Sequence, residues 1–186
     1  MLVKETGIAG VFILVPKVFA DERGYFFETW SQDRYKQAGI KEDFVQDNIS
    51  FSQKGVLRGL HFQYPNGQGK LVQVLSGIVF DVAVDIRVGS PTFGKYVWAE
   101  ISEENHRQMY IPSGFAHGFC VCSETAIFSY KCTNYYDPKT EGGVIYNDPD
   151  IGIEWPINEP ALSPKDAAYG RLSDIPENRL PKFEDK

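Results

Sequence analysis

The sequence predicts an all-β fold, an antiparallel barrel of the jelly-roll kind with a few short helices. Most of the chain alternates apolar and polar residues with a period of two, which is typical of strands that cover a core. Roughly ten such runs are separated by turn sequences such as Gly89-Ser90-Pro91. Many short strands with few helical segments favour a jelly roll or a related barrel.

The clearest run spans residues 79–87, where Val82 and Val84 share one face while Asp81 and Asp85 share the other. This pattern predicts a half-buried strand. Shorter runs rich in β-branched and aromatic residues predict the remaining strands, each bounded by turn residues. These are residues 11–15, 25–30, 44–51, 56–63, 71–75, 95–101, 108–111, 119–122, 126–136 and 144–146.

Two segments carry helix signals. Ser31 is suited to cap the start of a short helix that Gly39 would end. A second helix is expected to begin after Ser163, with Pro164 in its first turn, and to end at Gly170.

Composition sets the class of protein. A chain of 186 residues that is 42% hydrophobic suits one folded domain over residues 1–186, with 173–186 expected as a surface tail. The net charge of −6 argues against nucleic acid as a partner, since that needs a broad basic face. No apolar run approaches the roughly 20 residues of a membrane span, and the N-terminus does not resemble a signal peptide. We therefore expect a cytoplasmic protein with no membrane partner.

The three cysteines are Cys120, Cys122 and Cys132, and we expect them to be reduced and structural. The alternative is a Cys-x-Cys metal site. Because no Cys-x-x-Cys pair is present, the sequence favours the structural interpretation.

Histidine is the side chain best suited to proton transfer near neutral pH, and the chain holds three: His61, His106 and His117. His61 lies in an apolar run that also carries Arg58, and burying either group requires a partner, so the pair favours a functional site. Strict alternation places Arg58 and His61 on opposite faces. A bulge at Gly59 would turn both to one face, and otherwise they serve different surfaces.

His117 ends a Pro-x-Gly-x-x-His pattern that resembles the second motif of the cupin superfamily, in which this histidine can bind a metal. The companion His-x-His motif is missing, since its nearest equivalent holds His61 alone. Metal sites usually need at least three protein ligands, so we expect no metal. His106 lies in a polar turn and is expected at the solvated surface.

Tyr130 shares a strand face with Phe128 and Cys132, which predicts that its ring points into the barrel. An inward tyrosine needs a partner for its hydroxyl and can therefore donate a proton, although core packing is the alternative. Four basic residues are candidate contacts for an anion, and each could equally be a solvated surface charge. They are Arg23, Arg58, Lys70 and Lys165.

Taken together and in order, these segments resemble one family, the dTDP-4-dehydrorhamnose 3,5-epimerases. No single motif is decisive, but the ordered set covers nearly the whole chain and is very specific. The matching segments are residues 21–30, 46–50, 55–63, 68–72, 81–87, 89–94, 111–119, 130–136, 147–149 and 162–166.

The resemblance implies a cupin-like jelly roll, usually a homodimer with exchanged strands, that acts on a dTDP-linked 4-keto-6-deoxyhexose without metal or nicotinamide. It implies that His61 is the catalytic base, oriented by Asp166, and that Tyr130 is the general acid on the opposite face of the sugar. The residues implied to line the substrate site are Arg23, Glu28, Gln46, Asn48, Arg58, Lys70, His117, Glu141 and Lys165.

The implied reaction inverts C3 and C5 of dTDP-4-dehydro-6-deoxy-D-glucose, giving dTDP-4-dehydro-L-rhamnose. Both carbons flank the C4 ketone, so removing either proton gives an enolate. The chemistry needs a base on one face, an acid on the other and a group that stabilises the enolate, for which Lys70 is the candidate. Because no electrons leave the substrate, no redox cofactor is expected.

Three alternatives remain at this point. A related enzyme could epimerise C3 alone or isomerise a similar keto sugar, although Tyr130 favours inversion at both carbons. A metal-dependent cupin oxygenase or isomerase is disfavoured by the missing His-x-His motif. A non-catalytic sugar-binding module would leave the His61, Tyr130 and Asp166 set without a role.

Overall fold

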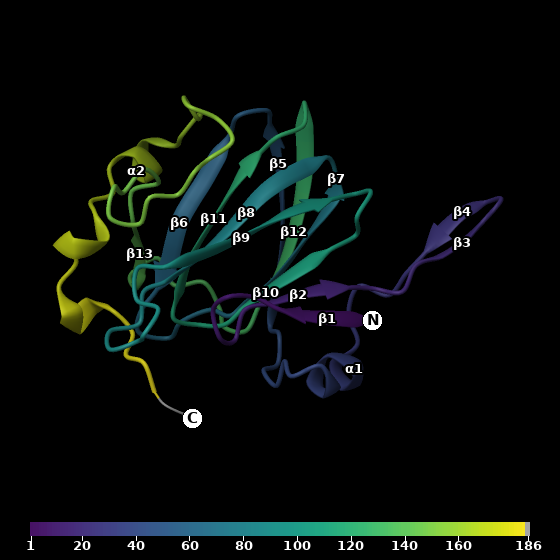
Figure 1. Cartoon of the computed structure of the whole chain (residues 1–186), viewed down its shortest axis with the longest axis horizontal. Coiled ribbons are helices and arrows are strands. Elements are labelled where there is room, and N and C mark those ends of the chain that lie inside the picture. Colours follow the sequence, from purple (N-terminus) through teal and green to yellow (C-terminus); the bar gives the residue numbers. More distant parts are fainter. Residues whose placement is uncertain (185–186) are drawn as a thin grey trace.

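The computed structural model describes residues 1–184 and contains two antiparallel sheets that face each other across a core (Figure 1). The six-stranded sheet has the order β1 (Leu2–Glu5), β2 (Phe12–Val15), β10 (Gln108–Ile111), β7 (Lys70–Ser76), β12 (Thr125–Cys132), β5 (Gln46–Gln53). The five-stranded sheet has the order β13 (Glu141–Gly143), β6 (Leu57–Gln63), β11 (Phe115–Val121), β8 (Ile78–Asp85), β9 (Tyr96–Ser102). This arrangement confirms the predicted all-β, jelly-roll class.

The first core fills the space between the sheets. Phe119 of β11 stacks on Phe128 of β12 with ring centroids 4.1 Å apart, and both side chains are buried. Val72 and Met109 complete the centre of this cluster, and Tyr130 packs against its edge. Burying each such side chain contributes about 1.5–3 kcal/mol, so these contacts hold the two sheets together.

The second core covers the outer face of the five-stranded sheet and corrects one expectation. Val82 and Val84 of β8 pack there, beneath Leu172 and Leu180 of the C-terminal segment. The opposite face of β8 is also buried, because its Asp81 lies between the sheets. The expectation that this strand is half-buried is therefore wrong, since the chain folds back over the face that would otherwise meet solvent.

The C-terminal region is built from short elements. These are α2 (Pro164–Ala167) and the 3-10 turns Leu172–Asp174 and Glu177–Arg179. Beyond them Lys182 forms a bridge with Val88. Most of the expected tail thus lies against the barrel, while residues 185 and 186 lie outside the described residues. Within residues 1–184, no helix is long and apolar enough to cross a membrane.

Both predicted helices are present but shorter than expected. Helix α1 spans Gln32–Gln37, and Ser31 occupies its N-cap position without a side-chain hydrogen bond. In α2 the Ser163 hydroxyl accepts a hydrogen bond from the backbone N–H of Asp166, so the predicted cap is confirmed. This cap fixes the first turn of α2, from which Asp166 reaches the barrel interior.

Several strands differ from the sequence expectation. The strand expected at 144–146 is instead β13 at Glu141–Gly143, because the backbone of Ile145 turns away to bond Gly170. The strand expected at 25–30 is shorter, and β1 was not expected. Together β3 (Phe19–Asp21) and β4 (Gly24–Phe26) form a two-stranded arm that projects from the barrel (Figure 1).

His106 holds the base of this arm, which corrects the expectation of a solvated side chain. Its φ of 51° places it in the left-handed region of a tight turn. The imidazole centroid lies 4.8 Å from the ring centroids of both Tyr25 and Phe27. The side chain is only partly exposed, because these two rings cover it.

Candidate active site

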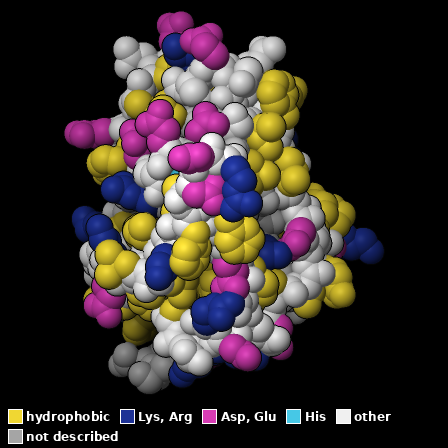
Figure 2. Space-filling view, turned by 90° about the vertical axis from the view of Figure 1, so that its right-hand side faces the viewer, with side chains coloured by type: hydrophobic (Ala, Val, Ile, Leu, Met, Phe, Trp, Pro, Cys, Tyr) yellow, Lys and Arg dark blue, Asp and Glu magenta, His cyan; other side chains and the backbone are white. Residues whose placement is uncertain are grey.

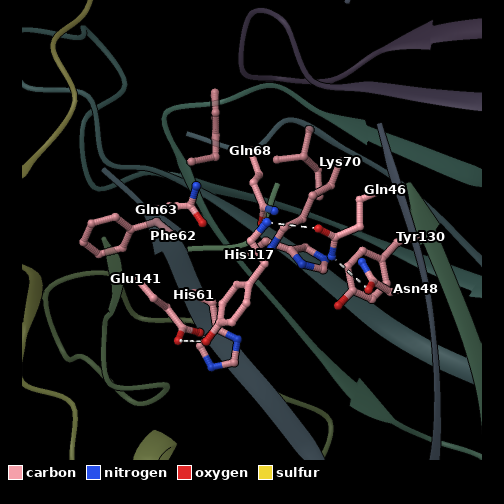
Figure 3. Close-up of a pocket in the computed structure, with 13 residues that line it drawn as sticks. Gln46, Asn48, His61, Phe62, Gln63, Gln68, Lys70, His117, Tyr130 and Glu141 are labelled. Carbon is pink, nitrogen blue, oxygen red and sulfur yellow. Dashed lines mark hydrogen bonds between the residues drawn. The ribbon is translucent and has the colours of Figure 1, made fainter. Parts of the chain in front are cut away.

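A cavity of about 260 Å³ opens between the two sheets and is lined by polar side chains from both (Figure 3). Among the lining residues are Gln46, Asn48, His61, Gln63, Gln68, Lys70, His117, Tyr130, Tyr136 and Glu141. Side chains that are far apart in the sequence meet here because neighbouring strands are paired out of chain order. A concave pocket with several titratable groups is the expected form of an active site.

A bulge in β6 turns Arg58 and His61 towards the same side. His61 lies opposite His117 and Arg58 opposite Phe119, so β6 holds one residue more than β11 between these pairs. The extra residue requires glycine at position 59, where φ is 131° and a Cβ would lie 2.5 Å from the Cα of Gly118. The Arg58 guanidinium reaches β5, where Nε donates to Ser52 Oγ at 3.1 Å.

His61 is held by a carboxylate that comes from α2. Its Nε2 lies 2.6 Å from Oδ1 of Asp166, which is 3% exposed. Burial alone would raise the pKa of Asp166, but hydrogen bonds from His61 and from the Ser163 hydroxyl group outweigh it and hold the pKa below its usual range. An ionised Asp166 accepts the Nε2 proton of a neutral imidazole and leaves the Nδ1 lone pair available as a base.

Tyr130 approaches the cavity from the other sheet. It lies on β12 and lines the pocket, as alternation along the strand predicted. Burial raises the pKa of its phenol, so the hydroxyl keeps its proton at neutral pH. Tyr130 and His61 therefore offer a proton donor and a proton acceptor from opposite walls of one cavity.

Lys70 places a positive charge beside Tyr130. It stands at the start of β7, and its ammonium lies 5.9 Å from the centroid of the Tyr130 ring. The residue is half-buried, and its ammonium makes no hydrogen bond to any group of residues 1–184. Burial lowers the pKa of the Lys70 ammonium, while Cys132, Asp81 and Glu141 partly offset that shift. An ammonium without a hydrogen-bond partner in a cavity is suited to stabilise an oxyanion.

His117 is paired with a buried carboxylate. Its Nε2 lies 3.0 Å from both carboxylate oxygens of Asp81, and Asp81 is fully buried. Burial lowers the pKa of His117, so the ring that lines the cavity is neutral. Within residues 1–184, no three His, Cys, Asp or Glu side chains converge in a way that could hold a metal ion.

Three residues form a hydrogen-bonded chain at the rim beside His61. The Tyr136 hydroxyl donates to Glu141 Oε2 at 2.7 Å, and the Lys165 ammonium donates to both Glu141 oxygens at 2.8 Å. Burial would raise the pKa of Glu141, but Lys165 and Tyr136 outweigh it and lower that pKa. Glu141 is thus an ionised acceptor at the cavity rim, and Figure 3 shows it next to His61.

Gln46 and Asn48 supply neutral polar groups from β5. The Gln46 amide donates to Asn48 Oδ1 at 3.1 Å, and Gln46 Oε1 accepts from the backbone of Tyr136 at 3.0 Å. Amides that both donate and accept are suited to a polar ligand of mixed character.

Arg23 and Glu28 are not brought to this cavity within the chain. Arg23 lies on the projecting arm, where its exposed guanidinium pairs with Asp21 at 2.6 Å. Glu28 follows the arm and pairs with Arg34 of α1. The expected site residues thus divide into a group inside the barrel and two residues outside it.

Sequence reasoning missed Asp81 and Tyr136 as site residues. Asp81 was expected on the polar, solvent-facing side of a half-buried strand. It shares a strand face with Asp85, and in the structure both side chains on that face are buried. Tyr136 was expected at the end of a strand over residues 126–136, but β12 ends at Cys132 and Tyr136 lies in the irregular segment that follows.

Comparison with known proteins shows the family to which the chain is similar. Residues 5–174 match the family model described as dTDP-4-dehydrorhamnose 3,5-epimerase. The chain is 58% identical to dTDP-4-dehydrorhamnose 3,5-epimerase of Salmonella typhimurium over 171 residues, which cover 90% of this chain and 93% of that protein.

Two crystal structures are also similar. That of dTDP-6-deoxy-D-glucose-3,5-epimerase from Legionella pneumophila, in complex with dTDP-4-keto-L-rhamnose, has 53% identity and a TM-score of 0.97 and covers 99% of both chains. The dTDP-4-dehydrorhamnose 3,5-epimerase of Elizabethkingia anophelis has 49% identity and a TM-score of 0.89, covering 94% of this chain and 97% of that chain.

Proposed function

The chain belongs to the dTDP-4-dehydrorhamnose 3,5-epimerase family, and from this premise we propose how its cavity inverts two carbons of one sugar. It is an isomerase that converts dTDP-4-dehydro-6-deoxy-D-glucose to dTDP-4-dehydro-L-rhamnose. The observation that carries the mechanism is the placement of His61, Tyr130 and Lys70 around one cavity, with Asp166 behind His61.

His61 is the base in this proposal. Its Nδ1 removes the proton from the carbon next to the ketone, and Asp166 stabilises the imidazolium that forms. The electron pair moves onto the ketone oxygen to give an enolate, whose charge Lys70 stabilises. The same base, His61, and the same cation, Lys70, act at C3 and C5, because both carbons flank one carbonyl group.

Tyr130 returns a proton to the opposite face of the sugar. Because it lies on the other sheet from His61, a sugar bound between them presents one face to each residue. Each cycle therefore takes a proton from one face and delivers a proton to the other, which inverts the carbon. Electrons are neither gained nor lost, and Lys70 supplies the positive charge beside the enolate, so we propose that the reaction needs no nicotinamide and no metal.

The experiment that tests this function is NMR of dTDP-4-keto-6-deoxyglucose incubated with the protein and EDTA in deuterium oxide. We expect deuterium at both C3 and C5, together with the L-rhamno product. Deuterium at C3 alone would indicate a C3 epimerase. A binding module would give a complex without exchange, and dependence on a tightly bound metal would contradict the proposal.

Replacing Tyr130 by phenylalanine should separate the removal of a proton by His61 from the return of a proton by Tyr130. The ring and its packing remain, but the proton donor is lost, so formation of the C5-inverted product should fall by about 10²-fold. Base-catalysed exchange should persist at a larger fraction of the wild-type rate, because His61 and Lys70 are intact. Time courses of deuterium incorporation measure the exchange and the configuration of the product measures the inversion, and an unchanged rate of C5 inversion would exclude Tyr130 as the acid.

The remaining cavity residues bind substrate in this proposal. Gln46, Asn48, His117 and Glu141 line the pocket, and Lys165 is tied to Glu141 at its rim. Arg58 lies at the start of β6, and its guanidinium reaches Ser52 of β5, where it is suited to a diphosphate. We also propose a cytoplasmic location, which suits three unpaired cysteines.

We propose that the active form is a homodimer in which the arm enters the partner's cavity. The outer face of β5, a sheet-edge strand, carries Ile49 and Phe51, which are 69% and 60% exposed. On the arm Phe19 and Phe26 are also exposed, as expected for side chains that a second copy covers. Figure 2 faces the side from which the arm projects and shows hydrophobic side chains among charged ones.

Mixed dimers provide a test of the exchanged arm. If Arg23 completes the partner's site, Arg23→Ala and His61→Ala subunits should each be weakly active alone. A mixed dimer would contain one intact site, because the Arg23→Ala subunit keeps its His61 and receives the partner's intact Arg23. Co-expression with two different tags isolates this species. Activity no higher than that of the parents would contradict the exchange, and a monomer in sedimentation analysis would contradict the dimer.

A further inference from the structure

Gly143 leaves a space beside His61 that another residue fills. In the pairing of β13 with β6, Gly143 lies directly opposite His61. Directly opposed residues of an antiparallel pair project to the same face, so a side chain at position 143 would contact the imidazole. Gly143 has none, and a Cβ placed there would lie 2.3 Å from two ring atoms of Tyr169.

The ring of Tyr169 therefore occupies the place of the missing cross-strand neighbour. It meets His61 edge to face, with ring centroids 5.9 Å apart and an interplanar angle of 70°. Such aromatic contacts are worth about 0.5–1.5 kcal/mol beyond area burial and have a defined geometry. Tyr169 does not line the cavity, so it contacts His61 from outside the substrate space.

The backbone holds Tyr169 in this place. It follows α2 by two residues, and the N–H of Ile145 donates to the carbonyl of Gly170 at 2.8 Å. This bond ties the segment that carries Tyr169 to the segment that follows Gly143. The ring is thus fixed against β13 by its own chain.

Asp166 alone does not determine the orientation of the imidazole. One hydrogen bond to Nε2 sets the position of that atom but leaves the ring able to tilt about the bond. A side chain packed on the flank of the ring removes this freedom and fixes the direction in which Nδ1 points. In catalysis a displacement of about 1 Å can cost about 10²-fold in rate.

We propose that Tyr169 is a positioning residue that fixes the tilt of the His61 imidazole by filling the space above Gly143. This inference rests on the proposed role of His61 as the base. The aromatic ring carries the effect and the hydroxyl group does not, because the ring makes the contacts with both His61 and Gly143. Substitutions at position 169 and at position 143 therefore test the proposal independently.

Substitutions at position 169 test the ring itself. We expect Tyr169→Leu to lower kcat between about 10- and 100-fold with KM nearly unchanged, because the substrate does not contact Tyr169. Tyr169→Phe should keep kcat within about threefold of the wild type, since it preserves the ring. A kcat for Tyr169→Leu equal to that of the wild type, or a loss confined to KM, would overturn the proposal.

Substitution at position 143 displaces the ring from the other side. The φ of Gly143 is not in the left-handed region, so the backbone allows alanine there, and the three atoms nearest to its methyl group, at 2.3–2.5 Å, all belong to the Tyr169 ring. Gly143→Ala should lower kcat as Tyr169→Leu does. The double variant with Tyr169→Ala should be no slower than Tyr169→Ala alone, because both substitutions disturb the same ring and their losses therefore do not add.

Gly142→Ala is the matched control. Its methyl group would lie 2.5 Å from the Phe62 ring, on the other face of the same strand, so the crowding is similar but does not involve Tyr169. The loss in Gly142→Ala should add to that of Tyr169→Ala, whereas the loss in Gly143→Ala should not. Additive losses at both glycines, or at neither, contradict the proposal, and thermal melting identifies any variant that fails to fold. Absence of exchange in the wild-type enzyme would instead contradict the proposed function.

Discussion

Replacing His61 by alanine should abolish proton exchange at both C3 and C5, with kcat lower by about 10³- to 10⁴-fold. The large effect is expected because one base serves both carbons, and no second free base faces the same side of the cavity in residues 1–184. The two alternatives are both engaged, His117 Nε2 by buried Asp81 and Glu141 by Tyr136 and Lys165. Deuterium incorporation in deuterium oxide, followed by NMR, measures the loss at each carbon separately.

Binding measurements separate loss of the base from loss of the fold. His61→Ala should still bind dTDP, because neighbouring residues supply the polar contacts and the imidazole is only partly buried. Asp166→Asn should reduce kcat by at least about 10²-fold, since an amide cannot stabilise the imidazolium as a carboxylate does. Exchange at the wild-type rate in His61→Ala would contradict the mechanism directly.

The sequence predicted the site best where local periodicity decides the answer. Alternation along residues 126–136 placed Tyr130 on the interior face, and the structure has it there. Ser163 followed by proline indicated the start of α2, and the cap is present. Glycine at 59 indicated a possible bulge, and the register of β6 against β11 contains one. These features depend on backbone geometry within a few residues.

Local patterns did not predict contacts between distant segments. His61 and Asp166 are 105 residues apart, and only the resemblance to a family suggested that they meet. The burial of Asp81 depends on His117 of the neighbouring strand, and the position of Tyr169 depends on a glycine in β13. In each case the second partner comes from another part of the chain, so no periodic pattern contains the information.

Lys70→Met should lower kcat by about 10²- to 10³-fold while leaving the protein as stable as the wild type or more so. Methionine has a similar unbranched shape, so the packing against Tyr130 survives and only the charge is removed. The ammonium makes no hydrogen bond within residues 1–184, and an unpaired charge in a cavity is costly to keep. Lys70 is therefore expected to be retained for stabilising the enolate rather than the fold.

The pH dependence of unfolding gives this prediction a second measurement. Burial holds the pKa of Lys70 in the folded protein below the 10.5 that it has when exposed. At a pH between these two pKa values, Lys70 is protonated in the unfolded chain but not in the folded chain. The free energy of unfolding therefore increases as the pH rises through that window. Lys70→Met should lose this increase in urea unfolding experiments. The exposed Lys54→Met is the matched control, because Lys54 does not line the cavity and its pairing with Glu124 raises its pKa above this window. It should change neither kcat nor the pH dependence within the window. If Lys70→Met instead destabilised the protein and left kcat unchanged, Lys70 would be a structural residue, and the enolate would need another partner.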